Sequence, residues 1–464
     1  MALYLYRTLR GSKQVCTLKV EKILQIVIGI ALPLLEYRSL LKSSGIRYGQ
    51  PRYIGYMTDN SQSFSTARGM NDLLPEDMRS FRYIEDTFRK ISSNWGYEEL
   101  RTPTIENYSL FTSAGGLTPE SLTRAYTFLD WDGWSGERVM LRYDSTISVA
   151  RAATLASLGL PARLFYVQSA FRFNESEDQG EEWQCGLEYL DAIPQSGELE
   201  VVTLAAELFS EMKIPAQIRL SHSGIVRAVF ELAEIDDMLV RRHLLARIAS
   251  EGEGVFSELL EGNASALALI NAIYADVNQS PEVLANFVAL ASAGLPEAVP
   301  ALTELQDLAE ILVSVGRNVS IDLSMQLDFE YYDGVFFEFI DTKNLKSLGR
   351  GGRYKPNPEG GVKSAVGFAL DIPVVLGHLQ LVRMPENGQV NLLPFGKEDF
   401  PYALQIADVL HENGIVASLD GKNSADIVVE IQNEIISLRR QDDRQDEIDL
   451  ASLLKLVLEE KGKE

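Results

Sequence analysis

The stretch from Met325 to Leu376 contains residue types that could bind a small ligand. Its segment LGRGGRY has three glycines within four positions, Gly349, Gly351 and Gly352. Glycine lets the backbone approach a ligand closely, because it has no Cβ atom. The preceding segment, MQLDFEYYDGVFFEFI, alternates apolar and polar residues and is rich in Tyr and Phe, which predicts a half-buried strand. We therefore expect a tyrosine-rich strand and a glycine turn to form the floor of a small-ligand pocket, with the apolar segment SAVGFALDI packed under it.

The histidines and cysteines show no spacing that would support a metal site or a catalytic triad. The four histidines are scattered, and the two cysteines, Cys16 and Cys185, form neither a metal-ligand pair nor a disulfide framework. We expect no metal, no cofactor and a reducing, cytoplasmic setting. The net charge of −23 is unfavourable for nucleic-acid binding, which depends on Lys and Arg. A local basic groove is the alternative that this charge balance leaves open.

The first 65 residues differ in charge from the rest of the chain. Residues 1–56 hold nine Lys and Arg against two Glu, so the remainder carries a net charge of about −30. An apolar run over residues 23–35 is too short to cross a bilayer, which takes about 20 residues. We interpret residues 1–65 as a leader outside the fold, with Met57 as the physiological start. A disordered extension and a targeting segment are the alternatives.

Apolar periodicity predicts the elements of a core domain over residues 66–384. Apolar residues at three- and four-residue spacing predict a helix over Met78–Trp95. Pro103 indicates an edge or interface strand, because proline cannot donate a hydrogen bond to a neighbouring strand. The other elements expected here are a hairpin over 123–146, a helix from about Ser148 to Leu158, and strands over Ala162–Phe173 and Trp183–Asp191.

Two further regions differ from this core in composition. Residues 224–317 are dominated by Ala and Leu and lack strand signals, which predicts a helical insertion. Residues 390–464 read as a small α/β unit of strand, helix, strand and strand. A charged helix is expected over its tail, 434–464.

Seven motifs, in order, resemble the catalytic core of class II histidyl-tRNA synthetases. They are RGMNDLLPED, LRTPTIE, LRYDSTISVARA, FRFNESEDQGEEWQCGLEYL, LDFEYYDGVFFEF, GRGGRY and AVGFAL. The resemblance covers about residues 66–380. It implies an α+β fold, a class II aminoacyl-tRNA synthetase-like antiparallel sheet flanked by helices. It also implies dimerisation through the strand around Pro103.

The same resemblance implies a histidine-binding site. Asp144, Thr146 and Gln184 would face the α-ammonium group, Glu188 and Tyr332 would bind the imidazole nitrogens, and Arg172 is retained from the family. The walls would be formed by Tyr331 and by the pocket loop Arg350, Gly351, Gly352, Arg353 and Tyr354. An ammonium group favours carboxylate and carbonyl oxygens, and an imidazole N–H requires an acceptor. Asp144 is one methylene shorter than the family's glutamate.

The nucleotide side of the family's site is changed. Activation of an amino acid with ATP requires positive charge around the α-phosphate. Leu327 and Val374 stand where the family has arginines. The loop over 174–182, expected to face ATP, carries five carboxylates and neither Lys nor Arg: Glu175, Glu177, Asp178, Glu181 and Glu182.

A synthetase core that keeps the histidine floor and loses the nucleotide groups is similar to the regulatory subunits of ATP phosphoribosyltransferase. That resemblance implies a noncatalytic chain without catalytic residues, and a short-form catalytic subunit as partner. It also implies a homodimeric core within a hetero-octamer, L-histidine as effector, and no tRNA or membrane partner. Residues 390–464 would be a truncated anticodon-binding-like domain.

Alternative functions and purely structural roles for individual residues stay open. A working histidyl-tRNA synthetase and a free-standing histidine-binding module are the alternative functions. Arg142 and Arg172 could be structural ion-pair residues, Glu188 could belong to an exposed acidic surface, and GRGGRY could be an ordinary turn.

Overall fold

The computed structural model describes residues 66–113, 119–130, 136–174, 179–275, 278–325, 332–356, 362–379, 389–419, 427–439 and 445–461. The expectations for the leader, for Leu327 and Tyr331, and for the middle of the acidic loop lie outside these residues. Within the described ranges, no helix combines the length and the apolar character that crossing a membrane requires.

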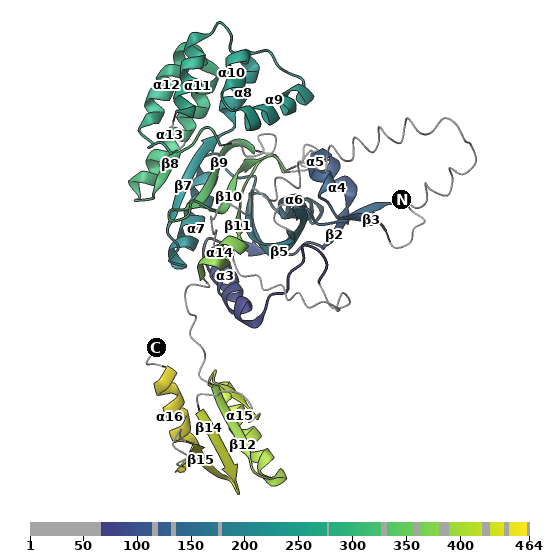
Figure 1. Ribbon diagram of the computed structural model, residues 1–464, viewed down its shortest axis with the longest axis vertical. Helices are drawn as coiled ribbons and strands as arrows, with labels where there is room; N and C mark the ends of the chain where they lie inside the picture. Colours follow the sequence, from purple (N-terminus) through teal and green to yellow (C-terminus); the bar gives the residue numbers. More distant parts are fainter. Residues whose placement is uncertain are drawn as a thin grey trace, which may run out of the picture. The chain divides into compact units, whose positions relative to one another are not determined.

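An eight-stranded sheet in the order β1-β5-β6-β11-β10-β9-β7-β8 organises the chain (Figure 1). Its six central strands pair antiparallel, and the short edge strands β1 and β8 pair parallel with their neighbours. The α+β prediction is thereby confirmed. The bounds are β1 Glu98–Glu99, β5 Ala162–Asn174, β6 Gln179–Leu190, β7 Ala216–His222, β8 Val319–Ile321, β9 Tyr332–Asp341, β10 Ser347–Tyr354 and β11 Ala365–Asp371.

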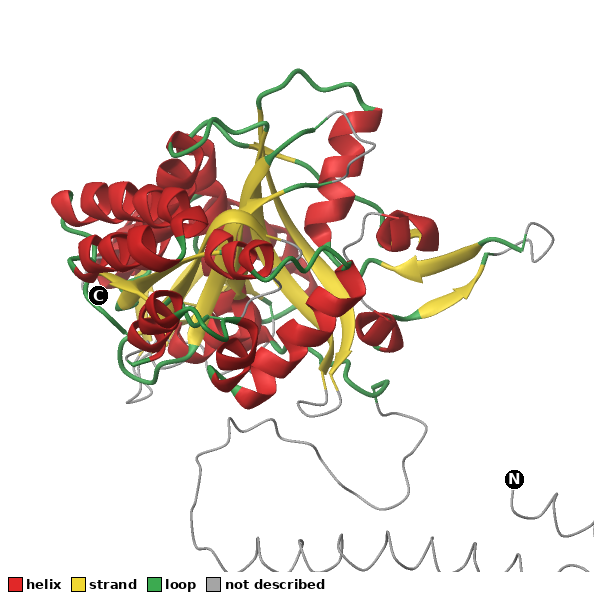
Figure 2. Cartoon of the chain, turned by 90° about the horizontal axis from the view of Figure 1, so that it is seen from above, coloured by secondary structure: helices red, strands yellow, loops and turns green. Residues whose placement is uncertain are grey.

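Helices cover one face of this sheet and form the main core with it. They are α3 Pro75–Asn94, α7 Ser196–Glu211, α13 Val299–Ser314 and α14 Ile372–Leu379. The sheet contributes alternate residues of each strand, because successive side chains of a strand point to opposite faces. Phe337, Phe339 and Phe368 lie within 6.3 Å of one another by ring centroids and are buried. Figure 2 shows these strands among the surrounding helices.

The helix predicted over Met78–Trp95 is α3, and it begins three residues earlier. Pro75 stands in its first turn, where proline needs no hydrogen-bond partner and its fixed φ suits a helix. Glu76 and Asp77 are also in this turn, where negative charge is favourable. Phe81, Ile84 and Phe88 are buried on the face that the spacing predicted.

The prediction of a glycine turn in LGRGGRY is wrong, because this segment is the central strand β10. The glycines serve close packing between strands. A Cβ atom on Gly351 would lie 2.2 Å from the carbonyl oxygen of Gly367 and 2.7 Å from the Phe337 ring. A Cβ atom on Gly352 would lie 2.6 Å from that of Phe336. Glycine is needed here because neighbouring strands approach too closely for a side chain.

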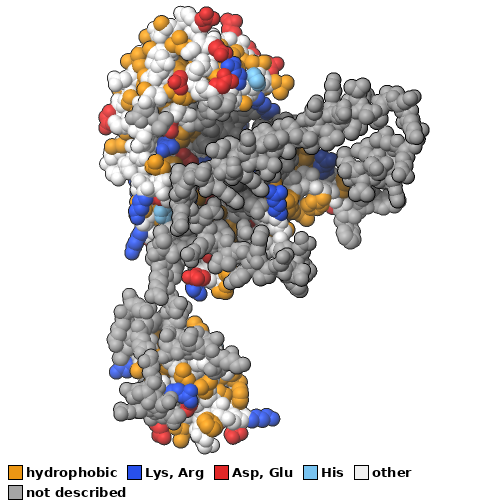
Figure 3. Space-filling model, viewed as in Figure 1, with side chains coloured by type: hydrophobic (Ala, Val, Ile, Leu, Met, Phe, Trp, Pro, Cys, Tyr) orange, Lys and Arg blue, Asp and Glu red, His pale blue; other side chains and the backbone are white. Residues whose placement is uncertain are grey.

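Residues 224–314 are helical over most of the described positions and extend the main core (Figure 1). Leu269, Phe287 and Leu305 are buried in the same cluster as the sheet residues. On the face that Figure 3 shows, charged side chains are interspersed with apolar ones over these helices. Their bounds are α8 Gly224–Leu232, α9 Met238–Glu251, α10 Gly254–Leu259, α11 Ala264–Tyr274 and α12 Val283–Gly294, followed by α13.

A three-stranded sheet in the order β2-β4-β3 contains the predicted hairpin. Its strands are β2 Ile105–Asn107, β3 Thr127–Leu129 and β4 Arg138–Leu141. The prediction of a strand through Pro103 is wrong, because this residue lies in the connection between β1 and β2. Its carbonyl oxygen accepts a hydrogen bond from the Arg142 guanidinium at 2.8 Å. The connection is therefore fixed by a buried side chain and not by strand pairing. Near this sheet are α4 Tyr108–Ser113, α5 Pro119–Thr123 and α6 Ser145–Leu155.

Residues 389–461 form a five-stranded sheet in the order β13-β12-β14-β15-β16 with its own apolar core. The prediction of a helix over the whole tail is wrong, because the tail contains the strands β15 and β16. A two-residue turn joins β14 to β15 in a hairpin. Asn433 and Glu434 have φ angles of 52° and 63°, as that kind of turn requires. Only the end of the tail is helical. The bounds are β12 Gln389–Pro394, α15 Phe400–Glu412, β13 Val416–Ser418, β14 Ile427–Gln432, β15 Ile435–Arg439, β16 Gln445–Ile448 and α16 Leu450–Lys461.

Candidate ligand-binding site

The face of the large sheet opposite the main core carries a row of residues that lie directly across from one another. Glu188 of β6 pairs with Gly367 of β11, Gly367 with Gly352 of β10, and Gly352 with Phe336 of β9. We call this the pocket face. A Cβ atom on Gly367 would lie 2.1 Å from Oε2 of Glu188. The glycine therefore gives the carboxyl group the space to lie across the neighbouring strand.

Glu188 is a buried carboxyl group at the centre of this face. It is 1% exposed, which rules out the interpretation as acidic surface. The Tyr354 hydroxyl donates to its Oε2 at 2.7 Å, and the Thr146 hydroxyl is a second hydrogen-bond partner. Burial raises the pKa of Glu188 to about 8, helped by the nearby Asp144 charge, while the two hydroxyls oppose the shift. Near neutral pH this group therefore holds a proton.

Asp144 begins helix α6, which starts three residues before the predicted position. Its Oδ1 accepts a hydrogen bond from the Ile147 backbone N–H at 3.2 Å. A carboxylate in this position satisfies one of the free donors at a helix start, and the sequence reading missed this cap. Asp144 remains close enough to Glu188 and Arg172 to affect the pKa of both. It therefore combines a structural role with a negative charge at the site.

Arg172 and Gln184 both contact Glu182. The Arg172 guanidinium donates to Oε2 of Glu182 at 2.7 Å, and the Gln184 amide donates to Oε1 at 3.2 Å. Burial lowers the pKa of Arg172, but the carboxylates of Glu182 and Asp144 raise it by more. The acidic residue expected to face ATP thus contacts two residues expected to face histidine.

The predicted pocket loop is divided between the two faces of the sheet. Tyr354 and Gly352 belong to the pocket face, and Arg350 is exposed. Arg353 points into the core, where it forms a close ion pair with Glu198 of α7 and donates to Ser364 Oγ at 2.8 Å. The prediction of Arg353 as a pocket wall is wrong, because side chains alternate along β10 and Arg353 pairs with Val366, a residue of the main core.

Tyr332 lies on β9 directly across from Tyr354. It is 9% exposed, and its ring stacks on that of Phe336 with centroids 5.4 Å apart. Its partner in the prediction, Tyr331, is outside the described residues. The structure therefore brings Tyr332, Tyr354 and Glu188 onto one region of the sheet.

Tyr166 is a pocket-face residue that the sequence reading missed. It is fully buried on β5, and a Cβ atom on Gly186 would lie 2.2 Å from its hydroxyl. Burial raises its pKa well above the ordinary value, and Thr146 is a hydrogen-bond partner. The signal was available, because Leu164, Tyr166 and Gln168 alternate with the apolar core residues of the same strand.

Arg142 has the structural role that the sequence left open. It is 2% exposed and donates to the carbonyl oxygens of Ser169, Thr102 and Pro103. These contacts fix the connection before β2 against β5. Arg142 is therefore not part of the pocket face.

Replacing Gly367 with alanine should disturb the site more than the fold. The added methyl group would overlap Oε2 of Glu188 and force the carboxyl group away from Tyr354. We expect a loss of about 1–3 kcal/mol of stability, the usual cost of overpacking, and a larger loss of ligand binding. Thermal unfolding and calorimetric titration with histidine measure the two effects. Gly377→Ala is the control, because nothing lies within 4 Å of that position.

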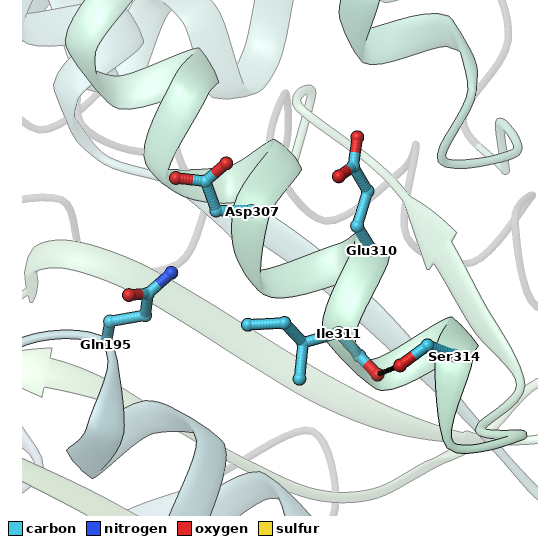
Figure 4. Close-up of a pocket in the computed structure, with 5 residues that line it drawn as sticks. All are labelled: Gln195, Asp307, Glu310, Ile311 and Ser314. Atoms are coloured by element: carbon cyan, nitrogen blue, oxygen red, sulfur yellow. Dashed lines mark hydrogen bonds between the residues drawn. The ribbon is translucent and has the colours of Figure 1, made fainter.

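A hollow of about 470 Å³ occurs elsewhere, between the start of α7 and α13 (Figure 4). It is lined by Gln195, Asp307, Glu310, Ile311 and Ser314, none of which is on the pocket face. Its two carboxylates are not joined by a third metal-ligating residue, and no such group of three occurs among the described residues. The predicted ligand-binding residues Gln184, Glu188 and Tyr354 instead lie on the pocket face.

Comparison with known proteins relates the chain to two kinds of protein. The family model for histidyl-tRNA synthetase matches residues 69–375. An ATP phosphoribosyltransferase regulatory subunit of Dehalococcoides mccartyi is 36% identical over 371 residues, covering 76% of this chain and 86% of the relative. A histidine–tRNA ligase of Sulfurisphaera tokodaii is 28% identical, covering 78% of this chain and 86% of the relative.

A solved structure supports the fold. It is described as an ATP phosphoribosyltransferase regulatory subunit/histidyl-tRNA synthetase from Bacillus halodurans, and it superposes with a TM-score of 0.66. The match covers 78% of this chain and 95% of that one at 22% identity, and so concerns the fold alone. The sheet is thus the class II synthetase-like sheet that the motifs predicted. The chain belongs to the histidyl-tRNA synthetase family and, within it, to the ATP phosphoribosyltransferase regulatory subunits.

Proposed function

We propose that this chain is a noncatalytic subunit that assembles with a short-form ATP phosphoribosyltransferase catalytic subunit and regulates it in response to L-histidine. The observation that carries the noncatalytic part is the ion pair between Arg172 and Glu182. An amino-acid-activating site needs a cation directed at the α-phosphate. Arg172, besides its place in the histidine-binding set, is the one arginine retained from the family that could serve an ATP site, and here it is paired with a carboxylate of the same chain.

The proposed effector site is the region around Glu188. A buried carboxyl group with a pKa of about 8 can accept a hydrogen bond from an imidazole N–H when ionised and donate one when protonated. Tyr354 contacts Glu188 through its hydroxyl, and Tyr332 lies directly across from Tyr354 on β9, so the two rings would form aromatic walls. Asp144, Thr146 and Gln184 would receive the α-ammonium group. A small amino acid with an imidazole side chain suits this set of residues.

The assembly is proposed from the relatives. The Dehalococcoides mccartyi protein is named a regulatory subunit of ATP phosphoribosyltransferase. We extend to this chain the catalytic partner that the name implies, with a homodimeric core in a hetero-octamer and without tRNA.

Histidine-dependent exchange of pyrophosphate into ATP is the first test. We expect the purified chain to show background exchange only, alongside an active histidyl-tRNA synthetase as positive control. The same preparation, mixed with a short-form catalytic subunit, should form a stable complex on size exclusion and increase phosphoribosyl transfer. Exchange above background that is lost on Arg172→Ala would instead establish a working synthetase, the alternative function.

Histidine binding is the second part of this test. Binding to the folded state stabilises it, by about 2.7 kcal/mol at a hundredfold excess over Kd, so histidine should raise the melting temperature. Glu188→Gln and Tyr332→Phe should reduce this shift and also weaken the effect of histidine on the partner, because coupling between sites is reciprocal. The control is Glu181→Gln, because Glu181 is on the same strand as Glu188 but on the opposite face of the sheet. A shift that is unchanged in both pocket variants would place the effector elsewhere.

A further inference from the structure

Arg172 and Glu182 form a pair across the β5–β6 hairpin. Their side chains are 32% and 28% exposed, so the pair is half-buried at the rim of the pocket face. The guanidinium lies 5.8 Å from the Tyr143 ring centroid. Its contact with Glu182 is a charge-assisted hydrogen bond, which is roughly twice as strong as a neutral one.

Gln184 completes the surroundings of the Glu182 carboxylate. Its amide donates to Oε1 while the guanidinium donates to Oε2, so both oxygens are bound. A cation on one side and a neutral N–H donor on the other form a site suited to a ligand carboxylate or phosphate. Gln184 is 6% exposed, which makes it a buried and well-fixed part of this arrangement.

We infer that Arg172 and Gln184 form an anion site that Glu182 of the same chain occupies, and that Glu182 thereby restricts the pocket to ligands presenting amine and imidazole N–H groups. An incoming phosphate must displace a carboxylate tethered beside its partners, at an effective concentration on the order of millimolar. The neighbouring Asp144 adds a second negative charge near Arg172. The inference rests on the proposed function, because it names the group that excludes nucleotide from that pocket.

Removing the Glu182 carboxylate should expose this anion site. We expect Glu182→Ala to bind inorganic pyrophosphate about tenfold to a hundredfold more tightly than the unchanged protein, the range that one charge-assisted hydrogen bond supplies. Isothermal titration of the full chain with pyrophosphate, without divalent metal, measures this. Glu182→Gln, which keeps the side-chain shape, is the second variant in case the alanine variant folds poorly.

Two controls separate the site from general charge effects. Glu181→Ala removes the same charge from the neighbouring residue, which pairs with Phe171 and faces the other side of the sheet. It should bind pyrophosphate no more tightly than the unchanged protein. Adding Arg172→Ala to Glu182→Ala should abolish the gain, whereas adding Asp144→Asn, which keeps a helix-capping side chain, should increase it.

The outcomes are distinct. Equal gains in Glu181→Ala and Glu182→Ala, no gain in either Glu182 variant, or a gain that survives Arg172→Ala would overturn the inference. These results leave the proposed function intact if the unchanged chain still assembles with the catalytic subunit. Conversely, a chain that gains pyrophosphate binding on Glu182→Ala but never assembles with that partner supports the anion site and contradicts the proposed function.

Discussion

Replacing Glu188 with glutamine should change the free energy of unfolding differently at pH 5 and pH 9. Relative to the unchanged protein, the variant should be about 4 kcal/mol more favoured at pH 9 than at pH 5. The folded-state pKa of Glu188 is raised from 4.5 to about 8, chiefly by burial. Between pH 4.5 and about pH 8, the folded state holds a proton on Glu188 that the unfolded state has released. The stability that this proton confers is fully present below pH 4.5 and is lost as the pH rises through 8. Glutamine does not titrate, so the variant escapes this loss.

Urea unfolding at the two pH values measures the difference. The control is Glu181→Gln, which changes a half-buried carboxyl group on the opposite face of the same strand. If the effect of Glu188→Gln were the same at pH 5 and pH 9, the carboxyl group would titrate alike in the folded and unfolded states. The buried geometry around Tyr354 would then be wrong.

Replacing Glu198 with alanine should cost about 3–5 kcal/mol of stability. Glu198 of α7 is 1% exposed and forms a close ion pair with Arg353, which is 7% exposed. Removing the carboxylate leaves a buried guanidinium whose other polar contacts are Ser364 Oγ at 2.8 Å and a long one to the Ala192 carbonyl. Those two acceptors do not neutralise its charge.

A double variant tests whether the ion pair or the packing is responsible. Glu198→Leu with Arg353→Met replaces both charges by apolar groups of similar size, and such replacements are often neutral for stability. We expect the double variant to lose less stability than Glu198→Ala alone, as measured by chemical unfolding. If the loss in the double variant equals the sum of the losses in Glu198→Leu and Arg353→Met, the two side chains do not depend on each other.

Several features of the site followed from the sequence because strand alternation is reliable over long strands. Gln184 and Glu188 are four residues apart, and the structure places both on the pocket face of β6. The strands over Ala162–Phe173 and Trp183–Asp191 are confirmed as β5 and β6, with β6 beginning four residues earlier.

The glycine-rich segment could not be interpreted from its own composition. Glycine is common in turns, and only the neighbouring strands show why it is needed in β10. Phe336, Phe337 and Gly367 approach this strand so closely that side chains at Gly351 and Gly352 would overlap them. That requirement depends on strand pairing, which joins segments distant in the sequence.

The contacts of charged residues were the least predictable part. Arg353 and Glu198 are 155 positions apart, and no local pattern relates them. Arg172 and Glu182 are only ten apart, but the hairpin register decides that Glu182, and not Glu181, faces the arginine. The sequence predicted an acidic loop unsuited to ATP, and the register shows which carboxylate contacts the arginine.

The alternation of side chains within β6 separates selection for core packing on one face from selection for the pocket residues on the other. Leu187 and Tyr189 are packed in the main core, whereas Glu188 between them contacts Tyr354 on the pocket face. Substitutions on opposite faces that share no partners should have additive effects on stability. A lineage can therefore exchange the charges of the pocket face, one residue at a time, without rebuilding the core beneath it. One sheet could in this way be inherited by aminoacylating and regulatory proteins alike.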